Sequence, residues 1–193
     1  FTGVFTPDDI TERFNIAAPN FFKQFFEFVW QGITHIWQGL DHILFLISLL
    51  LPAVLRRKDG RWQAVFSFRE ALGSVLKVVT AFTLAHSITL ALSALEIVRL
   101  PSKLVESTIA ASVILAALNN VFPVVQERRR WLVAFAFGLI HGFGFSSVLN
   151  ALMLDKRGLV SSLLGFNVGV EIGQLAIVVA FLPLAFAIRG SLV

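Results

Sequence analysis

The stretch GITHIWQGLDHILFL, residues 32–46, decides the fold because it sets ionisable side chains inside an otherwise apolar run. His35, Asp41 and His42 stand among leucine, isoleucine, phenylalanine and tryptophan, and the apolar run continues to Leu51. Its length predicts a membrane-spanning helix over residues 31–51. An ionised side chain at the centre of such a helix costs roughly 2.5–3.5 kcal/mol on insertion scales. The stretch therefore predicts a spanning helix whose polar side chains face a bundle interior and serve a function.

The composition of the whole chain agrees with a membrane protein. Hydrophobic residues make up 56% of the 193 residues, charged residues 15%, and the mean hydropathy is +0.80. Soluble domains have roughly 45–50% apolar and about 25% charged residues. We therefore predict an all-α polytopic bundle of about five transmembrane helices, with more in a longer chain. The predicted spans are residues 31–51, 75–97, 107–125, 131–152 and 159–188.

The residues before the first span divide into two segments. Residues 1–19 are polar and are predicted to be an extramembrane lead-in. Residues 20–30, NFFKQFFEFVW, repeat phenylalanine at near-helical spacing with Lys23 and Glu27 between, which favours an amphipathic helix lying in the membrane interface. The alternative is that they form the first turns of the first span. Residues 31–193 are predicted to be the transmembrane bundle.

The distribution of basic residues predicts orientation and partners. Arginine and lysine are densest after the first and third predicted spans, at residues 56–61 and 128–130, and Arg189 falls on the same side. The positive-inside rule then places the N-terminus outside and the C-terminus inside a bacterial inner membrane. Lipid head groups, rather than nucleic acid, are the expected partners of these short basic loops. There are no cysteines, which excludes disulfides and thiolate metal ligands. A homo-oligomer is left open.

All four histidines of the chain fall inside predicted spans. Each of four predicted spans carries a potential ligand at a similar depth. Imidazole with carboxylate suits nickel, cobalt, zinc or iron(II), so we predict a divalent metal site near the bilayer midplane. On a continuous helix His35 would share a face with His42, about 10 Å away along the axis, as a stepping stone for an entering ion. The predicted metal residues are Asp41, His42, His86, His141, Glu171 and His35.

Other polar and small residues surround these positions. The hydroxyls of Ser87 and Thr83 are candidates for hydrogen bonds that orient the metal ligands. Asn167, Glu171 and Gln174 form a polar stripe at helical spacing. Gly138, Gly142 and Gly144 flank His141 and permit close helix approach. Two interpretations of these polar residues without a bound metal stay open. They are a structural polar network and a proton relay.

Four segments together resemble the HupE/UreJ family of membrane proteins. They are GITHIWQGLDHILFL with its His-x5-Asp-His spacing, AFTLAHSITL, FGLIHGFGFS and FNVGVEIGQL, within residues 30–180. The resemblance implies divalent-metal permeation, nickel or cobalt in particular, with His35, Asp41 and His42 handling the ion. The nickel-permease motif Phe-His-Gly-x-x-His-Gly-x-Glu of the family is only partly met. Phe137 stands in place of its first histidine and Gly144 in place of its glutamate.

Three functions compete on this evidence. The first is a transporter or facilitator of a transition-metal ion, whose site would lie at the midplane. The second is an intramembrane zinc-dependent hydrolase, with Glu171 or Asp41 as general base and Ser87 polarising a carbonyl. The third is a tight structural or sensory metal site. We expect transport.

Overall fold

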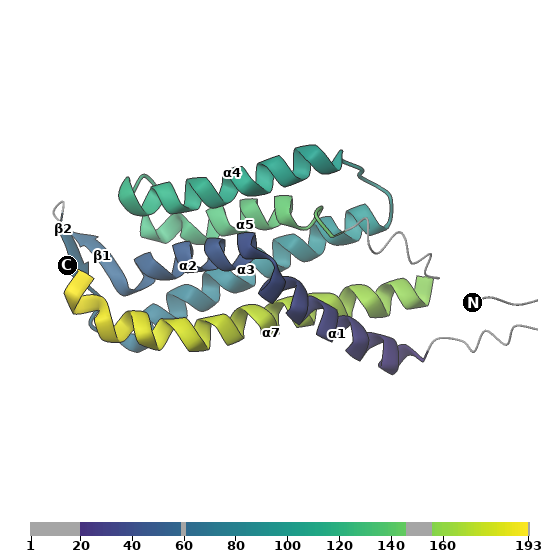
Figure 1. Cartoon of the computed structure of the whole chain (residues 1–193), viewed down its shortest axis with the longest axis horizontal. Coiled ribbons are helices and arrows are strands. Elements are labelled where there is room, and N and C mark those ends of the chain that lie inside the picture. The colour runs from purple at the N-terminus through teal and green to yellow at the C-terminus, as the bar shows by residue number, and fades with distance from the viewer. Residues whose placement is uncertain (1–19, 59–60, 146–155, 193) are drawn as a thin grey trace, which may run out of the picture.

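The computed structural model describes residues 20–58, 61–145 and 156–192, and within them the chain is a helix bundle (Figure 1). This confirms the predicted all-α class. The elements in chain order are α1 (Phe21–Gln38), α2 (Leu40–Val54), β1 (Leu55–Lys58), β2 (Arg61–Ala64), α3 (Phe68–Ala94), α4 (Ser102–Val121), η1 (Glu127–Arg129), α5 (Arg130–His141), α7 (Lys156–Ile188) and η2 (Arg189–Leu192).

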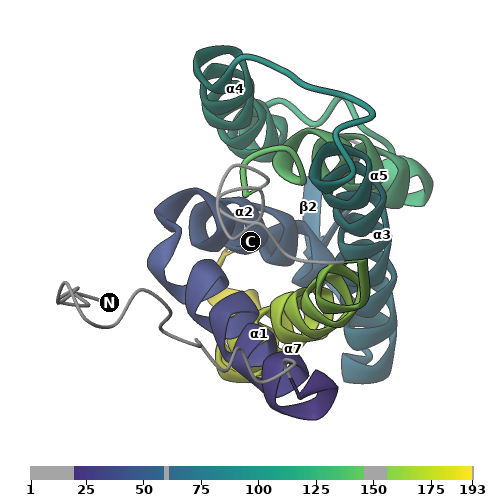
Figure 2. The ribbon, with the colours of Figure 1, turned by 90° about the vertical axis from the view of Figure 1, so that its right-hand side faces the viewer.

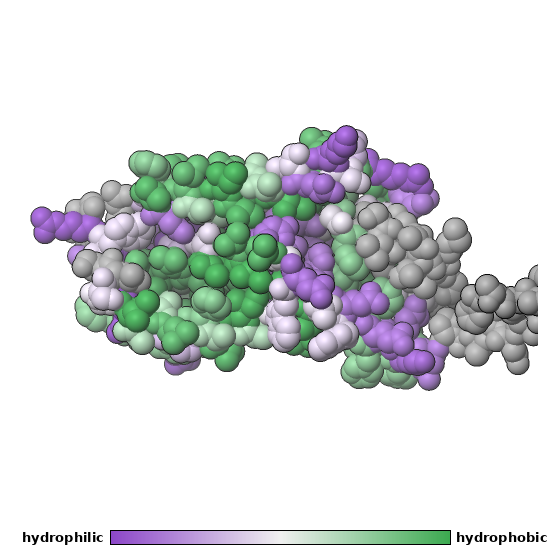
Figure 3. Space-filling view, in the orientation of Figure 1, coloured by the Kyte–Doolittle hydropathy of each residue, from purple (hydrophilic) through white to green (hydrophobic). Residues whose placement is uncertain are grey.

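Three of the described helices, α3, α4 and α7, are long and apolar enough to cross a membrane, and the bent pair α1 and α2 makes a fourth if it counts as one span. Five spans were predicted. The difference lies at residues 131–152, where α5 ends at His141 and residues 146–155 fall outside the described part. Hydrophobic residues cover much of the middle of the bundle surface, and hydrophilic residues gather toward its ends (Figure 3). Such a surface suits a protein surrounded by lipid.

The prediction of one continuous helix over residues 31–51 is wrong. The chain breaks at Gly39, and α1 and α2 meet at an angle of 72°. Residues 20–30 are the first turns of α1 and belong to the same helix as His35. Their place in the membrane interface stays a prediction. The break changes which side chains of the first span can meet.

Glycines let α1 and α7 cross in direct backbone contact. The buried residues of α1 recur every fourth position and face α7, which carries Gly165 and Gly169 at the crossing. A Cβ added at Gly169 would lie 2.1 Å from Val29 O, and one at Gly32 would lie 2.2 Å from Phe166 O. Only glycine fits at such a distance. The crossing therefore fixes the position of α1 along α7.

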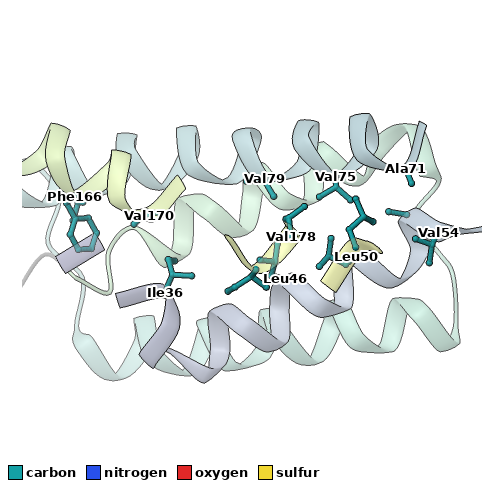
Figure 4. Close-up of a cluster of buried hydrophobic side chains, with 14 of the residues drawn as sticks. Ile36, Leu46, Leu50, Val54, Ala71, Val75, Val79, Phe166, Val170 and Val178 are labelled. Carbon is teal, nitrogen blue, oxygen red and sulfur yellow. The ribbon is translucent and has the colours of Figure 1, made fainter. Parts of the chain in front are cut away.

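A second glycine crossing joins α5 to α3. A Cβ at Gly138 would lie 2.4 Å from Phe82 O, and one at Gly142 would lie 2.3 Å from His86 O. The main apolar core lies between α1, α2, α3 and α7, and Figure 4 shows Ile36, Leu46 and Val178 among its residues. Seen from the end in Figure 2, α4 lies at one edge of the bundle and α1 with α7 at the opposite edge.

The two ends of the bundle differ in their connections. The hairpin β1–β2 and the end of α7 lie at one end, and the starts of α1 and α7 lie at the other (Figure 1). At the hairpin end, Arg56 pairs with both Glu70 and Glu127, and these carboxylates raise the pKa of its guanidinium. Basic residues of the predicted inner side, such as Arg69 and Arg189, belong to elements at this end. Which end faces the cytoplasm stays a prediction.

Candidate metal centre

The break at Gly39 brings two predicted site residues together. The His35 ring, in the last turn of α1, lies 4.7 Å from the His42 ring in α2, measured between centroids. The predicted separation of about 10 Å along one helix is therefore wrong. Gly39 has no room for a side chain, because an added Cβ would lie 2.6 Å from His42 Nδ1 and 2.9 Å from Asp41 Oδ1. The glycine thus allows both the bend and the approach of the ring and the carboxylate.

The other two histidines come from α3 and α5. His86 and His141 are 0% and 1% exposed, so both rings lie fully inside the bundle. The centroid of His86 lies 6.4 Å from that of His35, and the centroid of His141 lies 5.1 Å from that of His42. The close glycine contact between α3 and α5 holds these two rings at the same level. Each of four helices therefore places one imidazole in the same buried cluster.

Within the described residues, this cluster contains two overlapping sets of potential ligands. The first set is His35, His42 and His86, and one ring nitrogen of each lies within 4.8 Å of the other two. The second set is Asp41, His42 and His141, and one ligand atom of each lies within the same distance of the other two. Two ligands of one ion bound at about 2.0–2.1 Å lie no more than about 4.2 Å apart. Small inward movements of the rings therefore suffice to bind an ion in either set. His42 belongs to both sets.

Hydrogen bonds assign the tautomers of two rings. His42 Nδ1 lies 3.1 Å from Asp41 Oδ1, a carboxylate that only accepts, so this nitrogen carries the proton. The hydroxyl of Ser112 donates to Ile109 O at 2.7 Å and lies 3.0 Å from His141 Nε2, so it accepts from this ring. Each ring therefore keeps one unprotonated nitrogen. Second-shell partners of metal-bound histidine act in this way.

The remaining nitrogens of the cluster are buried and, apart from a contact between His86 and Asn167, lack a hydrogen-bond partner among the described residues. They are His35 Nε2, His42 Nε2, both ring nitrogens of His86, and His141 Nδ1. A buried polar atom without a hydrogen bond costs about 1–3 kcal/mol. A neutral imidazole has one N–H and one lone pair, so each of the four rings can offer one nitrogen to a ligand that accepts lone pairs. Imidazole is a preferred ligand of zinc, nickel and related ions. The residues present fit a divalent transition-metal ion.

Glu171 belongs to neither set among the described residues. Its Oε1 accepts a hydrogen bond from Thr80 Oγ1 at 3.3 Å, and both side chains are at least partly exposed. The ligand role of Glu171 therefore stays a prediction that the geometry does not support. From α7 it is the buried amide of Asn167 that lies beside His86.

A sequence profile described as HupE / UreJ protein matches residues 11–193. The chain belongs to the HupE/UreJ family. The match covers all four motifs on which the resemblance rested, and the resemblance is confirmed. No curated protein and no solved structure matches the chain.

This HupE/UreJ protein departs from the nickel-permease motif at two places, and the structure shows what stands there. Phe137, in place of a histidine, packs its ring 5.6 Å from that of Phe45 in an apolar cluster. Gly144 follows the end of α5, where an added Cβ would lie 3.2 Å from His141 O. The candidate ligands of this chain therefore come from α1 and α2 together with His86 and His141.

Aromatic rings enclose the histidines of this HupE/UreJ protein. Phe82 stacks on His86 at 6.1 Å and lies 5.2 Å from His141, measured between ring centroids. Phe166 also stacks on His86, at 6.2 Å, and lies 5.3 Å from His35. Both phenylalanines are almost fully buried. An apolar shell excludes water and strengthens the interaction of an ion with its ligands. Phe82 precedes His86 by one helical turn, a spacing that could have indicated this role from the sequence.

Helix ends add to the electrostatics of the centre. His35 lies in the last turn of α1 and His141 in the last turn of α5, so two helix C-termini end beside the cluster. The partial negative charge of a helix C-terminus favours a cation. Asp41 lies in the first turn of α2, where a carboxylate is favoured. Discontinuous helices with ends at mid-membrane are typical of ion sites in transporters.

The hydroxyls expected to orient ligands are engaged elsewhere. Ser87 donates to Thr83 O within its own helix at 2.7 Å, and Thr83 donates to Gln174 Oε1 at 2.9 Å. The hydroxyl that contacts a histidine of the cluster is instead that of Ser112 in α4, 3.0 Å from His141 Nε2, which sequence reasoning missed. A single serine in an apolar helix gives no signal that it faces a histidine of another helix. Ser87 therefore bonds within α3, and Thr83 links α3 to α7.

Proposed function

We propose that this protein is a membrane transporter or facilitator for a divalent transition-metal ion such as nickel or cobalt. The ion is handled by His35, Asp41, His42, His86 and His141. The observation that carries the proposal is the gathering of four buried histidine rings, each with a buried nitrogen that lacks a hydrogen bond, in one cluster of a bundle of membrane helices. Membership in the HupE/UreJ family supports the same reading.

The overlap of the two ligand sets favours passage over permanent binding. A structural site holds its ion in a closed set of four ligands. In this chain, His42 is common to two sets of three. An ion bound by His35, His42 and His86 can exchange one ligand at a time for Asp41 and His141 while His42 stays bound. A site that offers alternative partial ligand sets releases its ion more readily than one complete set does.

The setting of this function is an inner membrane of a bacterium, with the N-terminus outside and the C-terminus inside. The basic hairpin end of the bundle supports this orientation, because arginine and lysine are retained on the cytoplasmic side. The ion is the cargo of the protein, and the surrounding lipids are its constant partners.

Uptake into liposomes tests the proposal. Purified protein is reconstituted, nickel, cobalt or zinc is added outside, and a metal-sensitive dye reports entry. We expect saturable entry that falls to the rate of empty liposomes in His42→Ala and His86→Ala. Thr34→Ala is the matched control, because this neighbour of His35 donates only within its own helix, to Trp30 O and Gln31 O at 3.0 Å.

Two results would contradict the proposal. The first is entry in the histidine variants at the rate of the unaltered protein. The second is about one zinc ion per chain that exchanges slowly, with no flux through the protein. That result would point to a catalytic or structural centre made of the same residues.

A further inference from the structure

A cavity of about 490 Å³ lies between α2, α4 and α5, toward the hairpin end of the bundle and apart from the histidines. Its walls are almost entirely apolar and include Leu49, Leu115, Val133 and Phe137. Its volume falls in the range of roughly 300–1,000 Å³ that is typical of ligand pockets. The cavity is therefore large enough to hold an organic ligand rather than a single water molecule.

The rim of this cavity is apolar and faces outward. Leu115, Leu118 and Phe122 line it and are 57%, 47% and 67% exposed. Leu115 and Leu118 belong to the second half of α4, and Phe122 follows this helix. Helix α4 lies at the edge of the bundle in Figure 2. In a membrane protein such side chains contact lipid, since the hydrocarbon is as apolar as they are. A hydrocarbon chain can therefore enter the cavity directly from the bilayer.

Two polar atoms in the cavity have no hydrogen-bond partner among the described residues. They are Arg130 Nε and Asn120 Oδ1, both buried. Arg130 Nη1 donates to Pro52 O, and Asn120 Nδ2 donates to Ser48 O at 2.9 Å. A cationic side chain and an amide with unpaired polar atoms thus line an apolar cavity, and burying such groups without a partner is costly.

The charge around Arg130 indicates the sign of that ligand. Arg130 also lines a second, polar cavity of about 460 Å³, together with Lys77, Arg128 and Glu127. Glu127 is paired with Arg56, and Arg130 forms no ion pair within the described part of the chain. An excess of positive charge therefore lies where the apolar cavity meets the polar one. Arginine binds phosphate with two parallel hydrogen bonds, which makes it the preferred residue for such a group.

We infer that this cavity binds one anionic phospholipid, with an acyl chain between α2, α4 and α5 and the phosphate on Arg130. Asn120 Oδ1 accepts a hydrogen bond from a hydroxyl of the head group or the glycerol. Basic pockets between membrane helices are known to hold anionic head groups. The bound lipid ties α2, α4 and α5 together at the hairpin end. This inference does not depend on the transport proposal, because none of its residues belongs to the histidine cluster.

Native mass spectrometry of the detergent-purified chain tests the inference. The protein is incubated with phosphatidylglycerol or with phosphatidylcholine, and the retained lipid per chain is compared. We expect one tightly retained phosphatidylglycerol and at least about tenfold weaker retention of phosphatidylcholine, since a charge-assisted hydrogen bond is worth roughly that factor. Arg130→Gln should reduce phosphatidylglycerol retention by a similar factor.

Two further variants keep the test decisive. Val133→Trp fills the cavity and leaves Arg130 in place, so it should displace the lipid even if Arg130→Gln fails to fold. Arg69→Gln is the control, because Arg69 is an exposed arginine near the same end of the bundle. Equal retention of the two lipids would overturn the inference. So would equal losses in Arg69→Gln and Arg130→Gln, or full retention in Val133→Trp.

Discussion

Replacing Gly142 by alanine adds a single methyl group at the contact between α3 and α5, next to the candidate metal centre. The backbone of Gly142 has φ −62° and ψ −22°, which alanine adopts without strain, so the effect of the change is steric. The added Cβ would lie 2.1 Å from Thr89 Oγ1 and 2.3 Å from His86 O. The hydroxyl can rotate away, but the carbonyl belongs to the backbone of α3.

The size of the effect follows from these distances. Ordinary van der Waals contact begins at 3.4 Å, so α5 has to move away from α3 by roughly 1 Å in a close-packed interior. Overpacking of this kind costs about 1–3 kcal/mol in the free energy of unfolding. The same movement separates His141 from His86 and His42. We expect metal affinity to fall by about 10- to 100-fold, as when an outer-shell contact is lost.

Thermal unfolding in detergent and titration with cobalt(II), followed by its visible absorption, measure the two effects. Gly73→Ala in α3 is the matched control, because an added Cβ there meets nothing within 4 Å. This control should be neutral or stabilise the protein by up to about 1 kcal/mol. If Gly142→Ala has the same thermal unfolding midpoint and the same cobalt affinity as the control, the proposed coupling between the α3–α5 crossing and the metal centre is refuted.

Two further substitutions separate the residues around the cluster. Ser112→Ala removes the acceptor for His141 Nε2 and should weaken cobalt binding about 10- to 100-fold. Ser107→Ala in the same helix is the control and should leave cobalt binding unchanged, because the Ser107 hydroxyl bonds only to the helix backbone. Glu171→Gln should keep cobalt affinity within about twofold of that of the unaltered protein. The carboxylate of Glu171 bonds to Thr80, and a change outside the ligand set acts weakly. Loss of cobalt binding in this variant would restore Glu171 as a ligand.

The sequence was sufficient for the membrane bundle and for most of the candidate centre. Histidine and aspartate inside apolar spans are costly, so their presence at one depth predicts a shared site. This argument predicts a site with Asp41, His42, His86 and His141, and the structure brings these residues together. The fold class rests on hydropathy, which is a property of each segment alone and does not depend on how the segments pack.

Other features depend on contacts between helices that are far apart in sequence. The spacing of His35 and His42 assumes a straight helix, and the bend at Gly39 replaces an axial distance by a direct ring contact. A glycine costs only about 1 kcal/mol in a helix, so its presence alone does not predict a break. Likewise, the rotation of α7 decides that Asn167 rather than Glu171 approaches His86. That rotation is set by the glycine crossing with α1, which periodicity within α7 cannot reveal.

The central claim is that histidines of the buried cluster bind the ion directly, and X-ray absorption at the metal edge tests it most directly. Protein loaded with one equivalent of nickel or cobalt should show at least two imidazole ligands at about 2.0–2.1 Å. His42→Ala should lose ligands in that spectrum, because His42 belongs to both sets. A spectrum with only oxygen ligands, unchanged in His42→Ala, would contradict the account.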